Sequence, residues 1–333
     1  MLRPFHEATE TDMQKRKLGR SGIDVAPLAL GGNVFGWTAD EAKSFAVLDG
    51  FIGAGFNLVD TADVYSVWAP GHKGGESETV IGNWLKQRGG RDKVVIATKV
   101  GMQMAPDRKG LAKAYILRSV EESLKRLQTD YIDLYQSHRD DPDAPMEERF
   151  EAYGQLVNSG KVRAIGASNY DAARLKLALE TSAKLGAPRY ETLQPHYNLC
   201  ERGLYEGPLQ DLCVKEEIGV IGYYSLASGF LSGKYRAEGD LGQSVRGGGV
   251  KKYLNPKGFG ILKVLDELAA QTGATPSQIT LAWTMSRPAV AAPIVSATNT
   301  QQLADILKAV DVKLDAAAVA RLDAASAPQA AAA

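Results

Sequence analysis

Four polar side chains of different chemical types stand at or just after the ends of apolar segments. Asp60 ends "FNLVD" and Tyr65 follows five residues later. Lys99 ends "VVIATK" and His138 follows "YIDLYQS". A phenol has a pKa of about 10, but a neighbouring ammonium stabilises the phenolate and lowers that pKa. Lys99 would thus make Tyr65 a usable general acid, with Asp60 as counter-ion of the lysine.

His138 could donate to a substrate oxygen or relay a proton in such a group. Together the four side chains can protonate an oxygen while another reagent attacks its carbon. They do not themselves supply an electron pair, so a reduction would need a second component.

Short apolar, β-branched segments recur along the chain and are nearly continuously hydrophobic. This pattern is typical of parallel strands that are covered on both faces. The eight segments are "VAPLAL", "FNLVD", "VVIATK", "YIDLYQ", "VRAIGA", "YETLQ", "GVIGYYS" and "AVAAPIV". Between them lie segments whose apolar residues have helical spacing, at residues 40–53, 76–88, 113–127, 146–158 and 171–184. The alternation favours an α/β fold, a closed (β/α)8 TIM barrel, over an open sheet.

Polar residues occupy the predicted strand ends, where barrels carry their chemistry. In strand order these residues, from the second strand to the eighth, are Asp60, Lys99, His138, Ser168 with Asn169, Gln194, Tyr223 and Ser296. Tyr65 lies in the loop after the second strand. The sequence therefore predicts that these side chains converge on one mouth of the barrel.

No shift in composition marks a boundary within residues 1–333, so we expect a single domain with additions. The segment "KRKLGRSGIDVAP" predicts a hairpin that plugs the barrel bottom, and extra helices are expected near the C-terminus. Residues 232–256 are rich in glycine and predict a lid loop. Residues 1–14 and 324–333 are expected to be frayed.

Composition narrows the classes of partner. The 39 basic and 39 acidic residues cancel, so nucleic acid and anionic membranes are not favoured as partners. The two cysteines, Cys200 and Cys213, fit a reducing compartment, and no apolar run reaches the roughly 18 residues of a membrane span. We expect a cytoplasmic protein; its oligomeric state is not predicted.

Six ordered motifs resemble those of the aldo-keto reductase family. They are "DTADVY", "ATKVG", "LYQSHRDD", "GASNY", "QPHYNLCER" and "YYSLASGFLSGKYR", and the resemblance runs from Lys17 to about Leu322. It implies a barrel that binds NADP(H) or NAD(H) and passes a hydride to an aldehyde, a ketone or a sugar-like carbonyl compound.

The resemblance also implies roles for individual residues. Asp60, Tyr65, Lys99 and His138 match the catalytic tetrad, with Tyr65 as proton donor. The positions that match cofactor contacts are Gly32, Asn33, Asp60, Ser168, Asn169, Gln194, Tyr223, Leu226, Ser228, Gly229, Leu231, Lys234, Ser296, Thr298, Gln302 and Asp305. Ser168, Asn169 and Gln194 offer the donors and acceptors that a carboxamide needs. Either Tyr223 or Tyr224 would stack on the nicotinamide ring.

Two departures from the family pattern bear on specificity. The loop after Tyr65 is long, so Trp68 is expected to line a substrate pocket together with Phe35, Arg139 and Tyr197. The positions after the last strand that usually carry basic residues for the 2′-phosphate of NADP(H) are neutral here: Ser296, Thr298 and Gln302. We therefore expect NAD(H) to serve at least comparably, unless Arg246, Lys251 or Lys252 reaches the phosphate from the lid.

Other interpretations of these residues remain open. Taken singly, Asp60 with Lys99 could be a structural salt bridge, and His138 a core histidine. A metal site is not expected, because His6, His72, His138 and His196 show no His-x-His spacing. A non-enzymatic alternative is a cofactor-binding regulatory or sensing subunit, like the potassium-channel β subunits that resemble this family.

Overall fold

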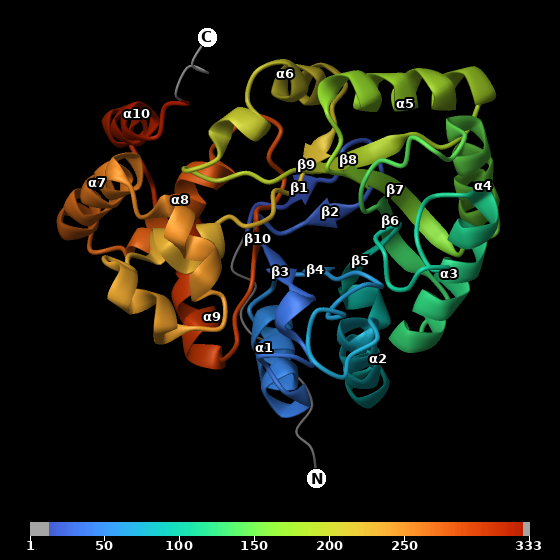
Figure 1. Ribbon diagram of the computed structural model, residues 1–333, viewed down its shortest axis with the longest axis horizontal. Helices are drawn as coiled ribbons and strands as arrows, with labels where there is room; N and C mark the ends of the chain where they lie inside the picture. Colours follow the sequence, from blue (N-terminus) through green and yellow to red (C-terminus); the bar gives the residue numbers. More distant parts are fainter. Residues whose placement is uncertain (1–12, 329–333) are drawn as a thin grey trace.

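The computed structural model describes residues 13–328, and its eight parallel strands form a (β/α)8 barrel (Figure 1). The strand order is β10-β3-β4-β5-β6-β7-β8-β9. The strands are β3 (Ala29–Gly31), β4 (Leu58–Asp60), β5 (Val95–Val100), β6 (Ile132–Ser137), β7 (Val162–Ser168), β8 (Tyr190–Gln194), β9 (Gly219–Val220) and β10 (Ile294–Val295). The ring closes where Ile294 N donates to Gly222 O at 2.8 Å. All eight predicted strand segments are confirmed.

Helices surround this ring (Figure 1). They are α1 (Glu41–Gly53), α2 (Glu76–Arg88), α3 (Lys113–Leu127), α4 (Met146–Asn158), α5 (Ala172–Leu185), α6 (Pro208–Lys215), α8 (Pro276–Met285) and α9 (Thr300–Leu307). Aspartates cap two of them: Asp40 accepts from Lys43 N at 2.9 Å and Asp171 from Arg174 N at 2.7 Å. The five helices predicted from spacing are confirmed to within one residue at each end.

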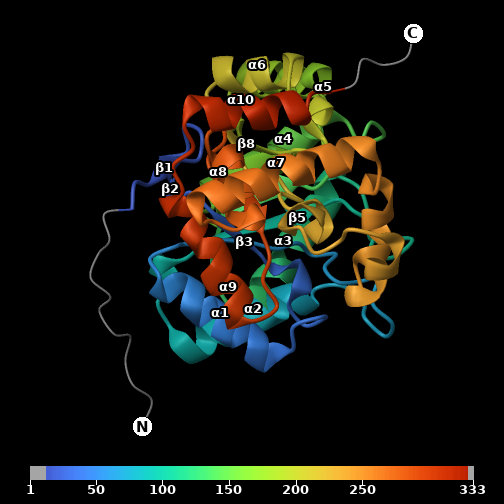
Figure 2. The same cartoon turned by 90° about the vertical axis from the view of Figure 1, so that its left-hand side faces the viewer.

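Two further helices cover one flank of the barrel. These are α7 (Pro256–Thr272) and α10 (Ala316–Ala325), which pack against each other (Figure 2). Because α10 continues to Ala325 and Ser326 is buried under a hydrogen bond from Arg202, the fraying expected from residue 324 is wrong for 324–326. Residues 1–12 and 329–333, where fraying was also predicted, lie outside the described residues.

The predicted plug at the barrel bottom is confirmed. Strands β1 (Arg16–Lys17) and β2 (Asp24–Val25) pair antiparallel. Leu18, Ile23 and Val25 are buried in the inner core, which also contains side chains of several barrel strands. The hairpin thereby fills the end of the barrel opposite the strand C-termini. Among the described residues, no helix is long and apolar enough to cross a membrane.

The segment 232–256, predicted as a loop, folds mainly into short 3-10 helices. Two of them, η5 (Glu238–Gln243) and η6 (Gly247–Tyr253), lie within the segment, and η4 (Ala227–Ser232) ends at its start. The other short 3-10 helices are η1 (Gly32–Val34), η2 (Arg91–Lys93), η3 (Arg202–Leu204) and η7 (Lys308–Asp311). Two ion pairs fix this segment to the barrel: Lys252 with Glu201 at 2.7 Å and Arg236 with Asp266 at 2.8 Å. We call residues 232–256 the lid segment.

Candidate active site

A buried ion pair lies at the C-terminal ends of β4 and β5. Lys99 Nζ is 2.8 Å from Asp60 Oδ2 and also donates to Thr61 O at 2.7 Å. Gln194 Nε2 donates to the other carboxylate oxygen, Asp60 Oδ1, at 2.8 Å. Lys99 is completely buried and Asp60 is nearly so. Because each charge is paired and hydrogen-bonded, the lysine is held in one position at the edge of the mouth.

Tyr65 stands next to this ion pair. Lys99 Nζ donates to Tyr65 OH at 3.2 Å, as the sequence predicted from their chemistry. The loop behind Tyr65 is closed on itself: Gly75 N donates to Tyr65 O at 2.9 Å, and Ser66 N donates to Glu76 Oε2 at 3.2 Å. These backbone bonds fix the phenol in the mouth.

The pKa of Tyr65 differs from the sequence prediction. Burial raises the pKa of this phenol, Lys99 lowers it and Asp60 raises it again, so that the pKa lies above the ordinary value for tyrosine. The expected net lowering by Lys99 is therefore wrong, because desolvation of the phenolate outweighs the ammonium. For Lys99, burial lowers the pKa, but Asp60 and Tyr65 raise it above its usual value. At neutral pH the pair consists of a neutral phenol and an ammonium.

His138 faces Tyr65 across the mouth, with ring centroids 5.9 Å apart. Burial, together with the positive charges of Lys99 and Arg139, holds the pKa of His138 well below its ordinary value. The imidazole is therefore neutral at neutral pH. Its Nδ1 is buried and has no hydrogen-bond partner among the described residues. A neutral imidazole can donate one hydrogen bond to a substrate oxygen.

Three polar side chains at the ends of β7 and β8 come together as predicted. Ser168 Oγ donates to Gln194 O at 2.9 Å, and Asn169 Nδ2 donates to His138 O at 2.9 Å. Gln194 Nε2 is bound to Asp60, as described above, and its Oε1 accepts no hydrogen bond within residues 13–328. Gln194 Oε1 is therefore available to accept a hydrogen bond from the N–H groups of a carboxamide.

Tyr223 and Tyr224, the two candidates for the stacking ring, differ in their surroundings. Tyr223 OH donates to Asn169 Oδ1 at 2.8 Å, and its ring stacks on His196 with centroids 5.2 Å apart. Tyr224 is 46 % exposed, with its ring edge-on to that of Tyr223. The two contacts hold the Tyr223 ring beside Asn169, and Tyr224 lies on the solvent side of that ring.

The backbone after Tyr223 forms a cradle that fits a phosphate. Ala227, Ser228 and Gly229 have φ angles of 48°, 57° and 96°. Successive residues with positive φ can direct backbone N–H groups to one concave side, which binds anions. A Cβ at Gly229 would lie 3.2 Å from Lys234 Cε, so the lysine stem closes this cradle. The residues therefore fit the pyrophosphate of a dinucleotide.

Two of the predicted cofactor contacts differ in the structure. The side chain of Leu231 is fully buried in the core, so only its backbone is available. The carboxylate of Asp305 accepts from Gln278 Nε2 at 2.8 Å and from Thr275 Oγ1 at 3.3 Å. Asp305 therefore ties α9 to the start of α8, and its assignment as a cofactor contact stays a prediction.

The other predicted cofactor residues line a neutral edge of the mouth. Ser296 Oγ donates to Asn33 Oδ1 at 2.7 Å, next to Gly32. Thr298 N and Oγ1 both donate to Gln302 Oε1, at 3.0 and 3.1 Å. These contacts join β3 to β10 and order the start of α9, but they bring no positive charge.

The aromatic wall beside Tyr65 consists of two tryptophans. Trp68 is 47 % exposed, and its ring centroid lies 5.7 Å from that of Tyr65. Trp37, which the sequence interpretation missed, contacts Trp68 with centroids 5.5 Å apart. Both rings are oriented edge-on to their neighbours, so together they extend the mouth outward from the phenol.

Two residues predicted in the substrate pocket lie in the core. Phe35 is fully buried, and the turn at Gly36 (φ +70°) is followed by Trp37, which reaches the mouth instead. Tyr197 is also fully buried, with its ring against Trp283 and its hydroxyl donating to Glu206 at 2.6 Å. The pocket assignment of Phe35 and Tyr197 is therefore wrong. Arg139 is exposed and follows His138 in the chain, and its place in the pocket stays a prediction.

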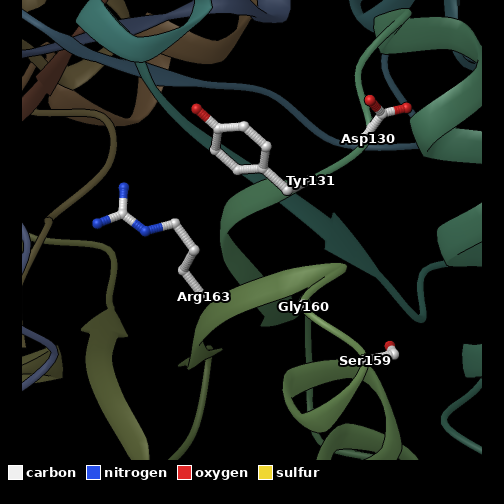
Figure 3. A pocket seen from close by; sticks show the side chains of 5 residues that line it. All are labelled: Asp130, Tyr131, Ser159, Gly160 and Arg163. Atoms are coloured by element: carbon white, nitrogen blue, oxygen red, sulfur yellow. The ribbon is translucent and has the colours of Figure 1, made fainter.

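A shallow surface depression of about 430 Å³ lies far from this site. It is lined by Asp130, Tyr131, Ser159, Gly160 and Arg163 (Figure 3). These residues flank the N-terminal ends of β6 and β7, opposite the tetrad. Its surroundings contain structural ion pairs, such as Arg163 with Asp133 at 2.7 Å. This depression has no connection with the catalytic chemistry.

Comparison with known proteins agrees with the geometry. Residues 27–327 match the model of the aldo/keto reductase family. The chain belongs to this family. It is 34 % identical to the uncharacterized oxidoreductase YrpG of Bacillus subtilis, over 91 % of this chain and 93 % of that protein.

Two further relatives show how widely the family reaches. Protein tas of Escherichia coli is 30 % identical over 94 % of this chain and 97 % of its own length. A proposed voltage-gated potassium channel subunit beta of Schizosaccharomyces pombe is 33 % identical over 89 % of this chain and 88 % of its own length. The family assignment supports an oxidoreductase, with NAD(P)(H) as the cofactor that the family generally uses.

Proposed function

We propose that this aldo-keto reductase transfers a hydride between a nicotinamide cofactor and the carbonyl carbon of an aldehyde, a ketone or a sugar-like compound, with Tyr65 as proton donor. The observation that carries the proposal is the position of Lys99 Nζ, 2.8 Å from Asp60 and 3.2 Å from Tyr65 OH, at the mouth that His138 also faces. A cytoplasmic location is part of the proposal, because Cys200 and Cys213 are both free thiols.

Each member of the tetrad has a distinct task in this proposal. Tyr65 stays protonated at neutral pH and gives its proton to the carbonyl oxygen as the carbon is reduced. Lys99 stabilises the phenolate that forms, and Asp60 keeps the lysine charged and in place. The neutral His138 donates a hydrogen bond that orients the carbonyl oxygen. The bound nicotinamide cofactor supplies the hydride.

The cofactor would extend from the barrel mouth along the positions described above. Ser168, Asn169 and Gln194 would hold the carboxamide, and Tyr223 would stack on the ring. The cradle at 227–229, with Lys234, would hold the pyrophosphate, and the lid segment would cover it. Gly32, Asn33 and the start of α9 would hold the adenosine half.

Dinucleotide preference follows from the neutral edge formed by Ser296, Thr298 and Gln302. Of the three lid cations considered for this phosphate, Lys251 pairs with Glu238 and Lys252 pairs with Glu201, whereas Arg246 lies over the ring of Trp37. A 2′-phosphate would thus lack the charged partners that bind it most strongly.

We therefore expect kcat/KM for NADH to be at least comparable to that for NADPH, measured with one aldehyde at saturating concentration. Thr298→Arg should shift the ratio toward NADPH by about tenfold, since it adds one guanidinium at this edge. A wild-type preference for NADPH above about a hundredfold, roughly 2.7 kcal/mol, would contradict the expectation.

Trp68→Ala is expected to raise KM for aromatic aldehydes by about tenfold, because it removes the ring that contacts Tyr65 at the mouth. The change should be smaller for short aliphatic aldehydes, which do not reach the wall. The matched control is Phe259→Ala, an exposed aromatic on α7. If KM stayed unchanged for every accepted substrate, Trp68 would not belong to the pocket.

The alternative function is cofactor binding with little turnover, as in a regulatory or sensing subunit. One relative of this chain is named as a potassium channel subunit beta, which gives this alternative a concrete example. The two functions differ in a simple assay: an enzyme oxidises NADH or NADPH when a panel of aldehydes and ketones is added. Tight cofactor binding without any carbonyl-dependent oxidation would favour the sensing subunit and refute the proposed function.

A further inference from the structure

Arg246 of the lid segment points into the active-site mouth. Its guanidinium carbon lies 5.8 Å from the ring centroid of Trp37. Trp37 contacts Trp68, which contacts Tyr65, with centroids 5.5 and 5.7 Å apart. The two tryptophans therefore form a continuous aromatic wall between the proton donor and the guanidinium.

The charge of Arg246 is not neutralised by the protein. Its guanidinium makes no ion pair within residues 13–328, and Nη2 is buried without a hydrogen-bond partner. Burial lowers the pKa of Arg246, and the titratable groups that act on it are the phenols of Tyr224, Tyr65 and Tyr235, with no carboxylate among them. A desolvated guanidinium without an anion is costly. Binding an anion there would remove that cost.

Other lid cations show the contrast. Arg236 pairs with Asp266 at 2.8 Å, Lys252 with Glu201 at 2.7 Å and Lys251 with Glu238 at 3.3 Å. Each of these charges is balanced on the outer surface of the protein. Of the lid cations, Lys234 and Arg246 have no carboxylate partner in the described part of the chain, and Arg246 is the one that contacts the aromatic wall of the mouth.

A second cation reinforces the positive character of the mouth. Arg139 is exposed next to His138, and its side chain makes no ion pair among the described residues. The buried carboxylate of the tetrad, Asp60, is already paired with Lys99. An anionic substrate would thus enter a region of net positive potential, which favours its encounter and binding.

We propose that Arg246 binds a carboxylate of the substrate, and that the enzyme acts preferentially on aldehydes or ketones that carry such a group. The inference rests on the proposed function, whose substrate class it names. A single guanidinium fork matches one carboxylate in a bidentate arrangement. The aromatic wall of Trp37 and Trp68 would contact the carbon skeleton between the carbonyl, at Tyr65, and the carboxylate.

The surroundings of Arg246 favour the substrate over the cofactor as the source of the anion. Its ring contact is Trp37, and Trp37 is joined through Trp68 to the proton donor. The cofactor pyrophosphate has its own expected cation, Lys234, which lies beside Gly229 of the cradle.

The test compares two matched substrates, 4-carboxybenzaldehyde and its neutral ester methyl 4-formylbenzoate. We expect the wild type to reduce the carboxylate with a kcat/KM at least about tenfold higher than the ester. Arg246→Gln should lower kcat/KM for the carboxylate by about a hundredfold, mainly through KM, because it removes a buried charge partner. The ester should change by less than about threefold.

Two control variants accompany it. Arg246→Lys should restore part of the preference, since it returns the charge without the fork. Arg236→Gln removes a lid arginine that pairs with Asp266, and should leave the ratio of the two substrates unchanged.

A binding measurement separates this inference from the proposed function. The reduced product, 4-(hydroxymethyl)benzoate, should quench tryptophan fluorescence of the wild type, because Trp37 and Trp68 line the path to Arg246, and should bind at least about tenfold more weakly to Arg246→Gln. Equal binding, or equal reduction of acid and ester by the wild type, would overturn the inference and leave carbonyl reduction intact. Weaker cofactor binding in Arg246→Gln, with both substrates equally affected, would assign the arginine to a cofactor phosphate and also overturn it.

Discussion

Tyr65→Phe is expected to lower kcat for aldehyde reduction by about 10²–10⁴-fold, the usual value of general acid catalysis. The change removes one oxygen and the hydrogen bond from Lys99 Nζ at 3.2 Å. The phenyl ring can keep the contacts with Trp68 and His138 that hold the side chain in place. The dissociation constant of the cofactor, measured by fluorescence quenching, should therefore stay nearly unchanged.

The combination of lost turnover and retained binding is what distinguishes a proton donor from a pocket wall. A neighbouring aromatic change, Trp68→Ala, should act through KM and serves as the matched comparison. Retention of more than about a tenth of the wild-type kcat in Tyr65→Phe would exclude Tyr65 as the general acid.

Lys99→Met is expected to have a comparably large effect on kcat and a separate effect on stability. Without the ammonium, the phenolate loses the group that stabilises it, so the pKa of Tyr65 rises further above its ordinary value. Reduction requires the protonated phenol and is lost as pH rises through that pKa. The alkaline limb of kcat/KM should therefore move to higher pH in Lys99→Met.

The same substitution leaves Asp60 buried without its cation. Removing one partner of a buried ion pair typically costs about 3–5 kcal/mol of unfolding free energy, and urea denaturation would measure this loss. Lys113→Met is the control, because Lys113 pairs with Glu151 on the surface and such pairs contribute about 0–1 kcal/mol. An alkaline limb that stayed in place, or moved to lower pH, would show that Lys99 does not act on the proton donor.

The elements of the barrel were predictable because hydrophobic periodicity carries their signal. Nearly continuous apolar segments mark strands that are covered on both faces, and helical spacing marks the connections. The convergence of Asp60, Lys99, His138 and Ser168 followed from one further rule, that parallel strands in a barrel bring their C-terminal ends to one side. The structure places these residues together as that rule requires.

Side-chain direction was the part that sequence could not supply. Phe35 and Trp37 stand on either side of Gly36, and only the turn decides that the tryptophan reaches the mouth. Tyr197 follows a strand end, yet its ring packs against Trp283 in the core and not in the mouth. Asp305 matches a family contact, but Gln278 of α8 and Thr275, which precedes that helix, hold its carboxylate. Each outcome depends on partners far away in the sequence.

The pKa of Tyr65 illustrates a second limit. The sequence indicated correctly that Lys99 lowers this pKa, but not that burial raises it more. The balance of desolvation and charge depends on how deeply the phenol lies and on whether Asp60 is already paired. Such opposing contributions can be weighed only with distances and burial in hand.

Direct hydride transfer to a carbonyl carbon at the Tyr65 site can be followed by isotope transfer. The reduced cofactor, labelled with deuterium at the transferring carbon, is mixed with 4-carboxybenzaldehyde, and the alcohol product is analysed by mass spectrometry. We expect wild-type protein to give an alcohol carrying one deuterium on the former carbonyl carbon, and Tyr65→Phe to give almost none in the same time. An alcohol without the label, or equal labelled product from both proteins, would contradict this expectation.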